Sequence, residues 1–198
     1  MARPAHTTPE LLRSSLAGVI LRMKSLNLPA IAEFPFLDPP EPRRVSDGYA
    51  LLRELGALDE ADRLTRIGRE LARLPLDPRI GRMLIAAREK GVLAEMLVIA
   101  AYLSVQDPRE RPFDRQEAAD QKHRRFADAN SDFVAILRLW MHVDALNAQR
   151  KSQRKFREGL RDEFISPNRV REWRDVHGQL ATQVKEMGWK VGELSPGL

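Results

Sequence analysis

The 198-residue sequence contains no cysteine. Without thiols the chain can form no disulfide, no cysteine-ligated zinc or iron–sulfur site, and no cysteine nucleophile. This absence fits an intracellular protein, and we expect a cytoplasmic location. The longest near-apolar stretch, residues 92–105, is interrupted by Glu95 and Ser104 and is too short to cross a bilayer. Residues 1–9 have no apolar signal-peptide core, so we expect no membrane partner.

Catalytic motifs are missing as well. The chain has no Gly-x-x-x-x-Gly-Lys-Ser/Thr phosphate loop, no Gly-x-Gly-x-x-Gly after a strand and no Gly-x-Ser-x-Gly elbow. Its histidines lack the His-Glu-x-x-His spacing of zinc proteases; they are His6, His123, His142 and His177. We therefore expect no catalytic residue, no metal site and no cofactor of its own in this chain.

The sequence does have strong helical periodicity. Hydrophobic residues make up 43% and charged residues 31%, a composition typical of a globular chain that buries a core. Apolar residues recur three and four positions apart through most of the chain, which predicts a mostly α-helical fold.

The pattern predicts two domains and a tail. Residues 1–76 read as helix, helix, small β-hairpin and helix, the order of a winged-helix domain, with the hairpin at residues 57–65. The first helix is expected to begin at Thr8, where a hydroxyl precedes Pro9. After a proline-containing boundary only helical patterns remain, so residues 77–188 are expected to form a helical bundle. The expected flexible tail is residues 189–198.

Positive charge is concentrated in one segment of the C-terminal half. Nine basic and four acidic residues lie between residues 148 and 174, a net +5 that equals the charge of the whole chain. One helical face is expected to present four arginines to a row of phosphates; they are Arg150, Arg154, Arg157 and Arg161. The polar loop 104–112 and the basic cluster 122–126 are further candidates for binding a single strand. A solvated surface or an acidic partner domain would explain the same residues.

Several motifs, in order, resemble the region that follows the two motor domains of DEAH-box RNA helicases. They are Thr8–Arg13, Leu21–Leu26, Phe34–Pro40, Leu64–Arg79, Leu103–Pro108 and Ser131–Phe133. Residues 106–112, 122–126 and 169–173 look most like the bacterial HrpA-type branch. The resemblance runs from Arg3 to Trp189, which is nearly the whole chain.

The resemblance implies a winged-helix domain followed by a ratchet-like helicase-associated domain. It also implies two partners, single-stranded RNA and motor domains in cis, against which these domains close the RNA channel. In the family, ATP and Mg²⁺ are used by the motor domains, whose motifs are absent from this sequence. We therefore expect the chain to be inactive as an ATP hydrolase on its own.

The resemblance and the charge pattern together give the expected RNA-binding residues. By position in the family they include the loop residues Ser104, Gln106 and Arg109, and Arg169 and Arg171 on the last long helix. The basic clusters add three more, which are Lys122, Arg124 and Arg154.

Two other hypotheses stay open. A stand-alone winged-helix DNA-binding regulator would insert the helix that carries Arg66, Arg69 and Arg73 into a major groove. An interaction scaffold would use the apolar residues 34–37 as a dock for a partner helix, although core packing explains the same residues.

Overall fold

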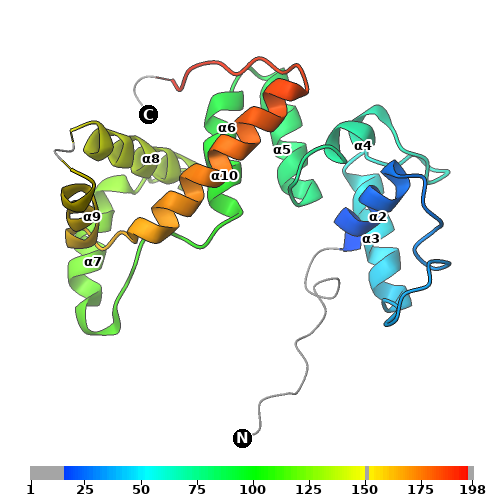
Figure 1. Ribbon diagram of the computed structural model, residues 1–198, viewed down its shortest axis with the longest axis horizontal. Helices are drawn as coiled ribbons and strands as arrows, with labels where there is room; N and C mark the ends of the chain where they lie inside the picture. The colour runs from blue at the N-terminus through cyan, green and yellow to red at the C-terminus, as the bar shows by residue number, and fades with distance from the viewer. Residues whose placement is uncertain (1–15, 150–151, 196–198) are drawn as a thin grey trace, which may run out of the picture. The chain divides into compact units, whose positions relative to one another are not determined.

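The structure, a computed structural model, describes residues 16–149 and 152–195. Its regular elements are helices, which confirms the predicted mostly α fold (Figure 1). They are α2 (Leu16–Ser25), α3 (Pro42–Glu54), α4 (Arg66–Leu71), α5 (Pro78–Glu89), α6 (Leu93–Leu103), η1 (Phe113–Arg115), α7 (Gln116–His123), η2 (Arg124–Phe126), α8 (Asp132–Ala148), α9 (Gln153–Asp162) and α10 (Pro167–Glu186). None of these helices is long and apolar enough to cross a membrane.

The chain divides into two compact units, the first ending at Ile85 and the second beginning at Ala86. This division falls inside α5, whereas the sequence predicts a boundary between residues 76 and 77. Because α5 continues through the division, the predicted boundary stays a prediction.

The first unit is built on the packing of α2 against α3. Ile20 and Leu52 are almost completely buried in its core. A Cβ added to Gly48 of α3 would lie 2.8 Å from Cδ1 of Ile20, so the two helices approach at a residue without a side chain. The helix start predicted at Thr8 lies outside the described residues.

The prediction of a β-hairpin at residues 57–65 is wrong. In the part of the chain that the structure describes no strand forms, and this segment has only one isolated antiparallel bridge, between Leu58 and Leu64. The Asp59 carboxylate accepts two backbone N–H groups of the turn, at 3.0 and 2.8 Å. Thr65, one residue beyond the bridge, already caps α4. The hydrogen bonds of the Asp59 and Thr65 side chains thus limit the antiparallel pairing to a single bridge.

The second unit is built around α6, which is buried on nearly all sides, with α10 lying along it and α8 beside it (Figure 1). Trp173 of α10 is fully buried, and its indole N–H donates to the backbone carbonyl of Val98 at 3.0 Å. Trp140 of α8 and Tyr102 of α6 pack edge-on against the same indole, at centroid distances of 4.8 and 5.2 Å. One side chain therefore joins three helices.

Residues 189–195, expected to belong to a flexible tail, contact the second unit. The Trp189 ring is buried, and the Arg88 guanidinium lies 4.2 Å from its centroid. Ser195 donates from its backbone N–H and its hydroxyl to one oxygen of the buried Glu95 carboxylate, at 2.9 and 2.6 Å. The described part of the tail therefore packs on α5 and α6.

Replacing Trp173 by alanine should lower the free energy of unfolding of the second unit by about 3–5 kcal/mol, because the cavity would lie where three helices meet. Trp173→Phe keeps a ring but leaves the Val98 carbonyl without its donor, and should cost about 1–3 kcal/mol. Guanidinium denaturation followed by circular dichroism measures both. A cost below 1 kcal/mol for Trp173→Ala would contradict the role given to this side chain.

Candidate nucleic-acid interface

The loop of residues 104–112 is held by an ion-pair cluster. The Arg109 guanidinium binds the Asp107 carboxylate at 2.8 Å and donates to the Tyr102 hydroxyl at 2.9 Å. Arg169 of α10 donates to the backbone carbonyl of Asp107 at 3.1 Å. Two of the predicted RNA-binding residues, Arg109 and Arg169, are thus brought together, and both bind the loop itself.

Backbone hydrogen bonds join the same loop to the segment before α10. The N–H of Glu110 donates to the Phe164 carbonyl, and the N–H of Ser166 donates to the Pro108 carbonyl, both at 2.8 Å. The middle of the loop therefore has a fixed position with respect to the first turn of α10.

Burial and ion pairing determine the charges of this cluster. Burial raises the pKa of Tyr102 to about 12, and the neighbouring Asp107 adds to the shift. Burial also pushes the pKa of Asp107 upward, but the hydrogen bonds from Arg109 outweigh it and leave the pKa below its ordinary value. The hydrogen bond with Asp107 raises the pKa of Arg109. At neutral pH a carboxylate, a guanidinium and a neutral phenol therefore hold the loop.

Ser104 and Gln106 are the exposed predicted residues of the loop. The Ser104 hydroxyl donates to the backbone carbonyl of Ala100 at 2.8 Å, so only its lone pairs remain available. Among the described residues Gln106 has no hydrogen-bond partner, and its amide is free to donate and to accept.

The basic cluster 122–126 lies against the turn between α9 and α10. Lys122 and Arg124 are exposed. Between them, the His123 ring nitrogen Nε2 lies 3.0 Å from the Glu163 backbone carbonyl. Arg125 forms an ion pair with the Glu163 carboxylate. His123 and Arg125 thus hold the turn before α10, while Lys122 and Arg124 face solvent and Phe126 is buried.

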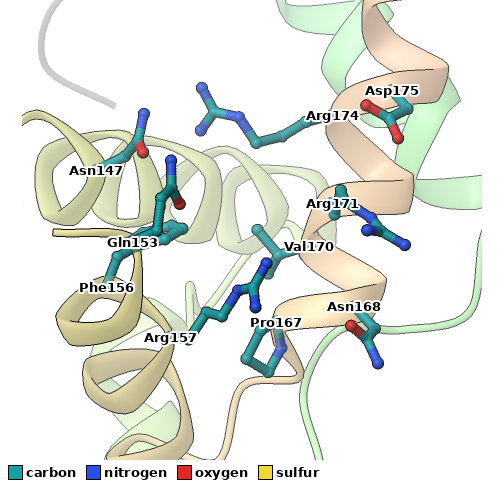
Figure 2. Close-up of a pocket in the computed structure, with 10 residues that line it drawn as sticks. All are labelled: Asn147, Gln153, Phe156, Arg157, Pro167, Asn168, Val170, Arg171, Arg174 and Asp175. Atoms are coloured by element: carbon teal, nitrogen blue, oxygen red, sulfur yellow. The ribbon is translucent and has the colours of Figure 1, made fainter.

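A pocket of about 370 Å³ lies between the end of α8, α9 and the first half of α10 (Figure 2). Three of its lining residues are the arginines Arg157, Arg171 and Arg174, and one is acidic, Asp175. Arg174 forms an ion pair with Asp144 of α8. Within residues 16–149 and 152–195, Arg157 and Arg171 have no ion-pair partner. The pocket therefore has an excess of positive charge.

The row of arginines predicted on one face is divided by the structure. Arg150 lies outside the described residues. Arg154 forms an exposed ion pair with Glu158, four residues along α9, at 2.8 Å. Arg157 faces the pocket, together with Arg171 of α10. An exposed pair of this kind contributes little to stability, so Arg154 can exchange Glu158 for a phosphate at small cost.

The residues of the alternative hypotheses are mostly engaged within the first unit. Arg66 forms an ion pair with Glu70 at 3.3 Å, and Arg69 donates to the Leu64 backbone carbonyl at 2.9 Å. α4 ends at Leu71, before Arg73.

The apolar residues proposed as a dock behave differently from one another. The Phe34 and Phe36 rings pack on each other at 4.7 Å and are half-buried, whereas Leu37 is exposed.

In the described ranges, 16–149 and 152–195, no three acidic or histidine side chains gather as metal ligands would.

Comparison with known proteins agrees with this architecture. Residues 50–76 match the winged-helix family model of the helicase associated domain (HA2), and residues 77–136 match its ratchet-like family model. Together the two matched ranges span residues 50–136. The predicted resemblance to HrpA-type RNA helicases is confirmed by the relatives of the chain.

Three relatives are similar to nearly the whole of this chain. It is 46% identical over 197 residues to the ATP-dependent RNA helicase HrpA homolog of Haemophilus influenzae, and 48% identical over 198 residues to ATP-dependent RNA helicase HrpA of Escherichia coli. It is 33% identical over 191 residues to the DExH-box ATP-dependent RNA helicase DExH1 of Arabidopsis thaliana. These matches cover 95–96% of the chain, but the chain spans only 15% of each bacterial relative and 19% of the plant one.

Asp107→Asn should destabilise the second unit by about 1 kcal/mol at neutral pH, because it removes the charge that Arg109 binds. The folded-state pKa of Asp107 is lowered, so the wild-type advantage is present above the ordinary value of 3.8 and is lost as the pH falls through the lower folded value. Urea denaturation of both proteins between neutral and acidic pH measures the difference. A difference that grew on acidification would contradict the assignment.

Proposed function

We propose that this chain is a non-catalytic module of a DEAH-box ATP-dependent RNA helicase that binds single-stranded RNA and closes the RNA channel against the motor domains. The observation that carries the proposal is the joint between the loop 104–112 and α10. It fixes the loop with the exposed Gln106 relative to α10, whose first half carries the exposed Arg171 and lines a positively charged pocket.

The predicted residues divide into two roles under this proposal. Arg109 and Arg169 are positioning residues, because their guanidinium groups bind the loop. The exposed cations Lys122, Arg124 and Arg171 contact phosphates, and Arg154 joins them by leaving its surface ion pair. Gln106 and Ser104 are exposed polar groups that can hydrogen-bond a base edge or a ribose hydroxyl, and an unpaired strand leaves the Watson–Crick edges of its bases open to them.

The residues present do not fit ATP and Mg²⁺. The sequence has no phosphate loop, and no acidic cluster suited to a metal is found in the described parts of the chain. We therefore assign nucleotide hydrolysis to motor domains in cis.

The stand-alone DNA-binding regulator is less well supported. A recognition helix needs several free side chains on one face. α4 has only six residues, and its two arginines, Arg66 and Arg69, are engaged by Glu70 and by the Leu64 carbonyl. The observations therefore favour the second unit over the first as the nucleic-acid surface.

Fluorescence anisotropy with a short single-stranded RNA should show binding that weakens steeply as salt rises. Arg171→Glu should weaken it roughly tenfold, because one phosphate contact becomes a repulsion. Lys185→Glu makes the same charge change at an exposed position near the other end of α10 and should have a much smaller effect.

The substitution Arg73→Glu distinguishes the RNA-binding helicase module from the stand-alone DNA-binding regulator. Our proposal expects single-stranded RNA binding to survive this change in the first unit. Sequence-specific binding to duplex DNA that is lost in Arg73→Glu, together with no salt-dependent binding of single-stranded RNA, would overturn the proposal in favour of the DNA-binding regulator.

A further inference from the structure

We propose that the pocket between α8, α9 and α10 receives one nucleotide of the bound strand, with its phosphate at Arg157 and its base against Phe156. This inference rests on the proposed function and specifies that one part of the surface binds a single nucleotide of the RNA strand. The residues that make the pocket come from three helices of the same compact unit.

Charge is the first argument for an anionic ligand. The pocket has three arginines and one aspartate on its walls, and of these arginines Arg174 alone forms an ion pair within the described residues, with Asp144. Figure 2 shows the Arg157 guanidinium between Val170 and Pro167. A guanidinium that lines a pocket and has no ion-pair partner among the described residues is suited to bidentate binding of a phosphate.

The start of α10 adds a second attraction for an anion. Pro167 and Asn168, the first two residues of this helix, both line the pocket. Ser166 at the N-cap makes no side-chain hydrogen bond to the first turn. The backbone donors of that turn therefore lack the usual cap, and the positive end of the helix dipole lies at the pocket wall.

The rest of the lining suits a base better than an acidic side chain. Phe156, Pro167 and Val170 form an apolar wall, and an exposed nucleobase stacks readily on an aromatic ring. The side-chain amides of Gln153 and Asn168 can donate to and accept from a base edge. A volume of about 370 Å³ lies within the range of small-ligand pockets, which suits a single nucleotide. A glutamate or aspartate would use the arginines and leave the apolar wall empty.

The test is an NMR titration of the ¹⁵N-labelled chain with adenosine 5′-monophosphate, with inorganic phosphate as the second probe. The mononucleotide should shift the amide signals of Gln153, Asn168 and Arg171 to saturation. Inorganic phosphate should shift the same signals with a dissociation constant roughly tenfold higher, because it makes no stacking contact.

Two substitutions and one control locate the ligand. Arg157→Glu should abolish the saturable shifts caused by both probes. Phe156→Leu keeps an apolar side chain of similar volume and should remove the advantage of the mononucleotide over phosphate while phosphate still binds. Lys185→Glu, which repeats the charge change outside the pocket, should leave the mononucleotide affinity within about twofold of wild type.

Three results of these titrations would overturn the inference. One is unchanged titration in Arg157→Glu, and another is equal affinity for phosphate and mononucleotide, which would make the pocket an anion site only. The third is a short polyglutamate peptide that shifts the same signals as tightly as the mononucleotide does.

A titration with single-stranded RNA distinguishes this inference from the proposed function. If the RNA binds but the pocket signals do not move, this inference fails and the proposed function stands. If the mononucleotide fills the pocket but RNA does not bind, the proposed function fails and the pocket is a site for free mononucleotides only.

Discussion

Two backbone hydrogen bonds, from Glu110 to Phe164 and from Ser166 to Pro108, connect a loop to a helix that follows much later in the chain. Arg169 adds a third connection by donating to the carbonyl of Asp107, 62 residues away. Everything else proposed for the second unit depends on this joint. It fixes the loop that carries Gln106 relative to the helix whose first half forms one wall of the pocket, so a strand would meet both as one surface.

The joint also gives Arg109 and Arg169 a structural role, because both guanidinium groups bind the loop. An arginine in a family motif is easily taken for a phosphate ligand, yet Arg109 is committed to Asp107 and Tyr102. Removing it from that cluster would leave the half-buried Asp107 carboxylate without the guanidinium that holds the loop. Arg171 and Arg157 have no ion-pair partner among the described residues, so a phosphate can bind them without breaking an existing pair. The arrangement therefore separates residues that shape the surface from residues that present charge on it.

Sequence periodicity predicted most of the helices because their buried faces repeat every three or four residues, as Val170 and Trp173, and Leu180 and Val184, do on α10. It failed at residues 57–65, where two short apolar runs around an acidic turn indicated strands but the Asp59 carboxylate accepts the backbone N–H groups of the turn. The motifs identified the family correctly. The pocket was not predictable, because Asn168 and Phe156 carry no recognisable pattern and meet only through the packing of α9 near α10. The sequence placed Arg157 in a row of regularly spaced arginines. That spacing could not show that Arg157 lines the pocket whereas Arg154 pairs with Glu158.

We propose that RNA binds the second unit at the loop 104–112 and the first half of α10. Photo-crosslinking with a 4-thiouridine-substituted single-stranded RNA, followed by mass spectrometry of the crosslinked peptides, tests it most directly. We predict that the crosslinks fall in the peptides that contain Gln106, Phe156 or Arg171. Crosslinks concentrated instead in the peptide of α4, with none in these three, would contradict the account.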